Sequence, residues 1–478
     1  SQPPAPPAPT ATATNTPAPN IVVNTLTDEL NSDGDCSLRE AIKAANTNVQ
    51  VDQCKPVGGS DTITFSVNGT ITMGIGGTGE DAALTGDYDI TESLTVIGNG
   101  AANTIISGNS VDRVFHILAG TVSLSEMTIS NGDAGALSGG GVFVGGGAGA
   151  LSNVTVSNNT AAEGGGVRVN AGTLTISGST IKSNTATGNG GGIHINSGSL
   201  TMSGGTIGGT GTGNTASLGG GIYALSTSSI SGTLIEDNSA TGGGGGGIQT
   251  AGGTTTIQNT TIKKNKGFDA GGGIHVATGG TVSINKSAID QNSLTSTGTG
   301  GGVYSEATFN AKETSITANT ASSGTSYGGG LYNNAGTATL KNVTFSNNTA
   351  SGSGGGIKVV GGTVKTNNVT IAYNSAPNGV GGGIHVDSTG TLEIGNTILS
   401  DNSALGVVEC DLGGGTVTDK DHNLIQGSTT CGFAVANNIT GSSANLAALA
   451  GTTPAYHALN AGSPAIDKGD AFGSATQA

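Results

Sequence analysis

The sequence predicts an all-β protein folded as a parallel β-helix with three strands in each coil, and three observations support this prediction. A Gly-Gly-Gly-aliphatic segment recurs ten times at intervals of 25 to 29 residues, which is the signature of stacked supersecondary units. Each unit holds three short runs in which apolar and polar residues alternate, as they do in strands. An asparagine also recurs shortly before each glycine triplet.

The aliphatic residue after each triplet starts the first strand of a coil. In the unit that begins at Gly190, the runs 193–195, 200–202 and 206–207 are the predicted strands, and Gly, Ser and Asn clusters mark the corners between them. Each strand would pair with its equivalent one coil away, about 4.8 Å along the axis. These anchors are Val142, Val167, Ile193, Ile222, Ile248, Ile274, Val303, Leu331, Ile357 and Ile384.

Two further columns of apolar residues would fill the interior together with the anchors. One runs along the second strands from Leu174 to Ile394, and the other along the third strands from Ile181 to Ile398. Ile and Val suit such stacks because branched side chains pack well on a pleated surface.

The recurring asparagines predict a ladder at an inside corner, where each side-chain amide bonds to the one a coil above and below. The alternative is a row of asparagines in surface turns. The predicted ladder is Asn159, Asn184, Asn214, Asn238, Asn265, Asn292, Asn319, Asn348, Asn374 and Asn402.

One short helix is predicted near the start of the chain, where it would cover the open edge of the first coil. Ser37 and Glu40 have the spacing of a capping box. One apolar face follows them, formed by Leu38, Ala41, Ile42 and Ala45.

The domain organisation follows from these patterns. We expect a Pro/Thr/Ala-rich tail at 1–20, an N-terminal cap at 21–60, the β-helix at 61–409, and C-terminal coils with a cap at 410–478. The tail composition cannot build a core and favours extended conformations.

The composition excludes several classes of partner. The net charge is −15 and charged residues are only 10% of the chain, so no basic stripe is available for nucleic acid, and acidic polysaccharides are disfavoured as well. No apolar run is long enough for membrane insertion.

Four cysteines form two local pairs, Cys36 with Cys54 and Cys410 with Cys431, which flank the two ends of the repeats. We expect two disulfides and therefore a secreted, extracellular or cell-surface location; the alternative is four free thiols in a cytosolic protein. The start at Ser1, without Met or an apolar leader, is what a processed secreted product would show.

Two segments carry a resemblance to known families. Residues Cys36 to Ala41 read CSLREA, and this segment resembles the CSLREA domain of secreted bacterial β-helix proteins. The stretches HNLI at 422–425, CGF at 431–433 and HALNAGSPAID at 457–467 resemble the end of choice-of-anchor surface proteins. The resemblance implies a right-handed parallel β-helix, secreted or displayed on a surface, with no enzymatic activity attached to the motif. Residues 470–478 depart from the pattern because they hold no recognisable sorting motif.

A column of large residues follows the anchors and points outward. In a chain with 3% aromatic residues, such an outward stripe predicts an interface with sugars or with another subunit. The alternative is that large side chains only shield glycine-rich backbone. The outward stripe consists of Arg168, His194, Tyr223, His275, Tyr304, Tyr332 and His385, with Phe143, Gln249 and Lys358 in the same column.

No cofactor is expected, and calcium is the one candidate that the sequence offers. Glu29, Asn31, Asp33, Asp35 and Glu40 follow the spacing of a calcium loop, with Gly34 at the turn. A solvated acidic turn is favoured over calcium binding, because a strand rather than a helix precedes the loop.

We interpret the chain as a non-catalytic extracellular structural protein. Its β-helical rod would be displayed on the cell surface or assembled head to tail into a filament, with the N-terminal tail docking on a neighbouring subunit. A glycan-binding adhesin and a polysaccharide lyase or glycoside hydrolase are the alternatives. The sequence shows no pair of outward carboxylates at the spacing of about 5 to 9.5 Å that glycoside hydrolysis needs.

Overall fold

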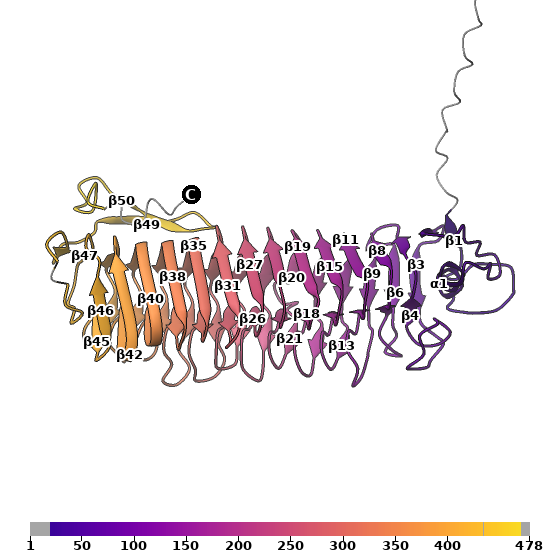
Figure 1. Cartoon of the computed structure of the whole chain (residues 1–478), viewed down its shortest axis with the longest axis horizontal. Helices are drawn as coiled ribbons and strands as arrows, with labels where there is room; N and C mark the ends of the chain where they lie inside the picture. The colour runs from indigo at the N-terminus through magenta and orange to yellow at the C-terminus, as the bar shows by residue number, and fades with distance from the viewer. Residues whose placement is uncertain (1–19, 434, 470–478) are drawn as a thin grey trace, which may run out of the picture.

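A computed structural model describes residues 20–433 and 435–469, which form one long parallel β-solenoid (Figure 1). In this part of the chain the elements are one helix, α1, and the strands β1 to β50. The prediction of a parallel β-helix is confirmed. The predicted docking tail at 1–20 lies, apart from Asn20, outside the described residues.

Three columns of strands pair in parallel and together make one 38-stranded sheet. The first column carries the anchors. It consists of β4 (Tyr88–Ile90), β7 (Phe115–Ile117), β10 (Val142–Val144), β14 (Val167–Val169), β18 (Ile193–Ile195), β22 (Ile222–Ala224), β26 (Ile248–Thr250), β30 (Ile274–Val276), β34 (Val303–Ser305), β37 (Leu331–Asn333), the starts of β40 (Ile357–Ala372) and β42 (Ile384–Gly395), and β45 (Cys410–Gly413).

The second column carries the inward pairs such as Leu174 and Ile176. It consists of β1 (Ile21–Val23), β2 (Asp61–Phe65), β5 (Leu94–Ile97), β8 (Thr121–Ser125), β11 (Ala148–Ser152), β15 (Thr173–Ser177), β19 (Ser199–Ser203), β23 (Ser228–Ser231), β27 (Thr254–Gln258), β31 (Thr281–Asn285), the starts of β35 (Thr308–Thr317) and β38 (Thr337–Ser346), the later parts of β40 and β42, and β46 (Thr416–Asp419).

The third column lies on the face that the C-terminal segment partly covers. It consists of β3 (Gly69–Thr72), β6 (Thr104–Ser107), β9 (Thr128–Ser130), β12 (Thr155–Ser157), β16 (Thr180–Lys182), β20 (Thr206–Gly208), β24 (Leu234–Glu236), β28 (Thr261–Lys263), β32 (Ala288–Asp290), the ends of β35, β38 and β40, β43 (Ile398–Ser400), β47 (Leu424–Ile425) and β48 (Ile439–Thr440).

A fourth column adds to the three that the sequence predicts. Its strands are only two residues long and form a separate ten-stranded parallel sheet. They follow the ladder asparagines, and their inward residue is commonly Ala. The column consists of β13 (Thr160–Ala161), β17 (Thr185–Ala186), β21 (Thr215–Ala216), β25 (Ser239–Ala240), β29 (Lys266–Gly267), β33 (Ser293–Leu294), β36 (Thr320–Ala321), β39 (Thr349–Ala350), β41 (Ser375–Ala376) and β44 (Ser403–Ala404).

The interior is one continuous apolar core that runs from Ile21 to Cys431. Inward and outward residues alternate along the strands as predicted; in β15, for example, Leu174 and Ile176 are buried between exposed neighbours. The predicted third column is wrong at its last position. Leu399 rather than Ile398 stands in register with Ile371, so Leu399 is the buried residue.

Each of the three positions in a glycine triplet requires glycine for a different structural reason. Gly190 has a φ of +66°, a conformation that favours glycine. A Cβ on Gly191 would lie 2.6 Å from the carbonyl oxygen of Gly220 in the next coil. A Cβ on Gly192 would lie 2.6 Å from the carbonyl oxygen of Gly221 and 3.1 Å from Nδ2 of Asn214. Backbones of successive coils therefore approach too closely at this corner for any side chain.

The asparagine ladder is present in the structure. The Nδ2 of each asparagine from Asn159 to Asn374 donates to Oδ1 of the next at 2.9 to 3.0 Å. Asn292, for example, accepts from both the backbone N–H and the Nδ2 of Asn265, and donates to Ile262 O and to Asn319. These amides are buried, and the ladder gives them the hydrogen bonds that buried polar groups need.

Helix α1 (Leu38–Thr47) closes the N-terminal end. Ser37 is its N-cap and forms the predicted capping box with Glu40. Its apolar face is buried, at 0% exposed for Leu38, Ala41 and Ile42. Within the described residues no helix is both long and apolar enough to cross a bilayer.

Two disulfides hold the two ends, as predicted. Cys36 and Cys54 join α1 to the segment that follows it, with a Cα–Cα distance of 5.1 Å. Cys410 and Cys431 join strand β45 to a C-terminal loop, with a Cα–Cα distance of 5.7 Å. The sheet contains both β1 and β48, so it continues across the boundaries predicted at residues 60 and 409.

The C-terminal segment folds back along the solenoid as a hairpin of β49 (Leu446–Ala450) and β50 (Tyr456–Leu459) (Figure 1). It lies over the third column, where His457 Nε2 is 2.9 Å from the hydroxyl of Ser346. Outward residues of this column are small and buried where the hairpin passes, as at Ala288 and Ser315.

Substituting one glycine of a triplet should break the stack. In Gly192→Ala the new Cβ meets two groups of the next coil, so we expect the free energy of unfolding to fall by about 3 kcal/mol or more, the cost of overpacking plus a disturbed ladder. Gly74→Ala is the matched control, because a Cβ there meets nothing within 4 Å. Urea unfolding measures both; equal losses in the two variants would contradict this account.

Candidate functional sites

The outward stripe forms a single column in the structure. Parallel register places each member beside the next, as with His194 beside Tyr223 and Tyr304 beside Tyr332. The rings contact each other along the axis. His194 and Tyr223 meet edge to face at 5.1 Å, His275 and Tyr304 at 4.9 Å, and Tyr304 stacks on Tyr332 at 5.5 Å.

Much of the stripe lies beneath the loops that precede the glycine triplets. Arg168 donates to Ser138 Oγ and pairs with Glu163, and Lys358 lies over the ring of Tyr327, and these three partners belong to those loops. The buried members of the column are His194, Tyr223, Gln249, Lys358 and His385, whereas Arg168, His275, Tyr304 and Tyr332 are partly exposed. As an interface with sugars or subunits the stripe stays a prediction.

His194 is the most enclosed titratable member of the stripe. It is 2% exposed, and burial together with the neighbouring Arg168 lowers its pKa to about 3. It is therefore neutral over the physiological range, and it serves as a flat ring between Arg168 and Tyr223 rather than as a charge.

A network of side chains around His385 lies at the C-terminal end of the outward stripe. His385 lies 2.7 Å from Asp387 through Nε2 and 2.9 Å from Asp411 through Nδ1. Lys358 Nζ lies 2.9 Å from Asp387. The sequence alone did not predict that these carboxylates lie together, although Asp411 stands in strand register with His385. These contacts link side chains of three successive coils, and the ion pair of Lys358 with Asp387 joins two of them.

A second acidic cluster, which the sequence analysis missed, lies in the first coils. Asp87, Asp89 and Asp112 are all buried; Arg113 Nε lies 2.9 Å from Asp87, and His116 Nδ1 lies 3.1 Å from Asp89. Burial and the nearby Asp89 raise the pKa of Asp87 to about 8. Asp89 and His116 extend the outward column, because β4 pairs in register with β7 and β7 with β10, but these coils lack the glycine triplets that reveal the column.

The calcium candidate is a real cluster of carboxylates. Ligand atoms of Glu29, Asp33 and Asp35 lie within 4.8 Å of one another, and so do those of Asp35, Glu40 and Asp52. Burial and the neighbouring carboxylates raise the pKa of both Glu29 and Asp35. Asp52 also belongs to this cluster, and the spacing of residues within the predicted calcium loop could not reveal it.

The two ends of the loop are already engaged with protein groups. Asn31 donates through Nδ2 to Glu29 and to Asp33. The carboxylate of Glu40 accepts the backbone N–H groups of Asn31 and of Ser37. Glu40 thus serves the capping box, and calcium binding at this cluster stays a prediction.

Calcium should stabilise the protein if this cluster binds it. A hundredfold excess of Ca²⁺ over its dissociation constant would raise the free energy of unfolding by about 2.7 kcal/mol relative to the protein in chelator. Asp35→Asn should abolish the increase because Asp35 belongs to both groups of ligands, whereas the exposed Glu92→Gln should retain it. Calorimetric melting with Ca²⁺ and with chelator measures this, and equal stability in the two buffers would show that the loop is only an acidic turn.

The asparagine ladder ends on a carboxylate. Asn402 Nδ2 donates to Glu409 Oε2 at 2.7 Å. Glu409 precedes Cys410, which pairs with the anchor Ile384, so it takes the place of the third glycine of a triplet. Burial raises the pKa of Glu409 to about 7, although the hydrogen bond from Asn402 opposes the shift.

Glu409 should make stability depend on pH. Its folded pKa of about 7 lies above its ordinary value of 4.5, so the folded protein holds this proton more tightly, and the free energy of unfolding falls as the pH rises from about 4.5 to about 7. Glu409→Gln keeps an acceptor for Asn402 and has no proton to lose. The advantage of the variant should therefore grow by up to about 3 kcal/mol across this window.

Urea unfolding at several pH values between these limits measures the effect. Glu393→Gln, a partly exposed glutamate paired with Lys365, is the control and should show no such trend. A difference between Glu409→Gln and the wild type that does not change with pH would refute the assignment.

Comparison with known proteins gives one match. A family model of the Chlamydia polymorphic membrane protein (Chlamydia_PMP) repeat matches residues 342–359. This segment runs from within β38 through Asn348 and the triplet at 354–356 into β40, so one corner of one coil is similar to that repeat. Searches of curated proteins and of solved structures found no match. The resemblance of the two ends to the CSLREA and choice-of-anchor families stays an expectation.

Proposed function

We propose that this chain is a non-catalytic β-helical rod of the cell exterior, secreted or displayed on a cell surface, whose function is structural. The observation that carries the proposal is the state of the outward stripe. Its large and charged side chains are stacked on each other, paired and largely covered by loops, so they reinforce the rod instead of surrounding an open reaction site.

Two observations support the location. Both disulfides close ends of the solenoid, and such bonds persist in oxidising compartments. The matched repeat carries the name of a membrane protein family, and a repeat of this kind suits display at a surface. The net charge of −15 and a surface rich in Thr, Ser and Asn would keep an extended rod in solution.

The carboxylates do not favour an enzyme. Asp387 and Asp411 both contact His385, and Asp387 also pairs with Lys358, so both carboxylates are already engaged with protein groups. The buried Asp87, Asp89 and Asp112 lie against Arg113 and His116. We interpret both groups as electrostatic links between coils. Among the described residues, no observation favours the lyase or hydrolase alternative.

We further propose that the rods assemble head to tail. Helix α1 packs against β1, β2 and β4 and covers the first coil, so bare coils of two subunits cannot simply stack. The proposal therefore assigns the contact to residues 1–20, which would dock on a neighbouring subunit as an extended segment.

Removing the tail tests the assembly. Deletion of residues 1–20 should leave the melting temperature unchanged and should abolish filaments in negative-stain electron micrographs. A variant that replaces these residues with a Gly/Ser segment of equal length is the control for length and should also fail to assemble. Filaments that persist after the deletion would refute tail docking, and a full-length protein that forms none would refute assembly while leaving the rod intact.

A further inference from the structure

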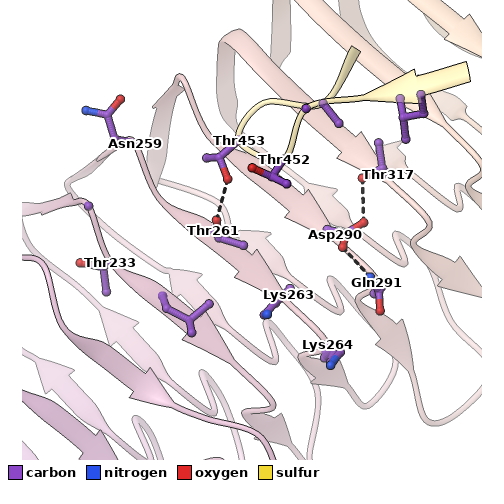
Figure 2. A pocket seen from close by; sticks show the side chains of 15 residues that line it. Thr233, Asn259, Thr261, Lys263, Lys264, Asp290, Gln291, Thr317, Thr452 and Thr453 are labelled. Atoms are coloured by element: carbon purple, nitrogen blue, oxygen red, sulfur yellow. Dashed lines mark hydrogen bonds between the residues drawn. The ribbon is translucent and has the colours of Figure 1, made fainter. Parts of the chain in front are cut away.

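A cleft of about 720 Å³ opens where the tip of the C-terminal hairpin leaves the solenoid. Its floor is the outward face of β24, β28 and β32, and its wall is the hairpin tip at 451–455 (Figure 2). The hydroxyls of Thr261 and Thr453 meet at 3.0 Å and join floor to wall. This volume falls in the range of about 300 to 1,000 Å³ that is common for ligand sites.

The lining combines many neutral polar groups with three apolar residues, Leu234, Leu449 and Ala455. Leu234 lies in the floor and Leu449 in the wall, and both are partly exposed. Sugars present hydroxyls around their rings and C–H groups on their faces, so they match such a mixture. The neutral polar side chains are Thr233, Asn259, Thr261, Gln291, Thr317, Thr452 and Thr453.

The charges in the cleft cancel. Lys263 and Lys264 both approach the carboxylate of Glu236, at 3.4 and 3.6 Å. Asp290 is the remaining charge on the floor. Glu236 is a buried neighbour outside the lining; it offsets one of the two lysine charges, and Asp290 offsets the other. Because the whole chain is also acidic, the cleft favours a neutral ligand over an anionic one.

The polar groups of the floor are held in place before any ligand arrives. Asp290 accepts a hydrogen bond from Gln291 Nε2 at 2.7 Å and another from the hydroxyl of Thr317 at 2.8 Å (Figure 2). Because such groups need little ordering, binding to them costs little entropy. The floor also repeats from coil to coil, about every 4.8 Å, which suits a ligand that itself repeats.

We propose that this cleft binds a neutral, linear oligosaccharide, which lies across the third-column strands with the hairpin tip as one wall. The site is separate from the outward stripe, which follows the first column. It does not depend on whether the rod assembles into filaments.

The test uses the full chain and a panel of neutral tetrasaccharides with gluco-, xylo-, manno- and N-acetylglucosamine backbones, with an oligogalacturonate as the acidic probe. Saturation-transfer NMR and calorimetry should show binding of at least one neutral member and none of the acidic probe. Thr261→Val and Gln291→Ala should each weaken binding about tenfold, the loss of a hydrogen bond to the ligand. Thr206→Val is the matched control, because Thr206 holds the same outward row two coils from Thr261 but lies outside the cleft.

Several results would overturn the proposal. These are the absence of binding across the neutral panel, equally strong binding of the acidic probe, or binding that survives both cleft variants. Binding lost only in Tyr304→Ala and Tyr332→Ala would assign sugar recognition to the outward stripe instead. Unfolding midpoints close to the wild type would show that the cleft variants remain folded, and Thr452→Ala, on the exposed hairpin tip, gives a further variant with little risk to folding.

Discussion

The close approach of successive coils at the glycine corner is the constraint on which the rest of the structure depends. The backbones there leave no space for a Cβ, and the ladder amides lie against the same atoms, as Asn214 does beside Gly192. Glycine thus sets the distance between coils, and asparagine uses that distance to complete its hydrogen bonds. The two residue types act at the same corner, and this accounts for their recurring together along most of the chain.

The two ends of the solenoid are closed in different ways. At the N-terminal end Arg39 is fully buried, bonds Asp28 through two nitrogens, and also reaches the carbonyl oxygen of Gly86. In the CSLREA segment Cys36 forms a disulfide, Ser37 and Glu40 cap the helix, and Leu38 and Ala41 fill the core. At the C-terminal end Glu409 terminates the ladder. Every residue of the CSLREA motif therefore has a structural role.

The sequence predicted the coil, the ladder, the disulfides and the cap, because each depends on local spacing or on the repeat. It did not predict the two-residue strands of the fourth column, which are too short to show alternation. It could not show that loops cover much of the outward stripe, because the alternation of apolar and polar residues predicts strands and does not predict the path of a loop. It also did not predict that Asp87 lies beside Arg113, because the first coils lack the glycine triplets from which strand register can be predicted. The cleft depends on a hairpin that contacts residues far away in sequence, as Thr453 contacts Thr261.

The returning hairpin also changes how the rod would come apart. In a plain solenoid each coil touches only its neighbours, so unzipping can start at a free end and proceed one coil at a time. Here the hairpin holds Ser346 through His457 and Thr261 through Thr453, across several coils at once. The last coils are thereby covered by a segment that reaches back to the middle of the molecule. A rod pulled or digested from that end would first have to release the hairpin, and only then could its coils open one at a time.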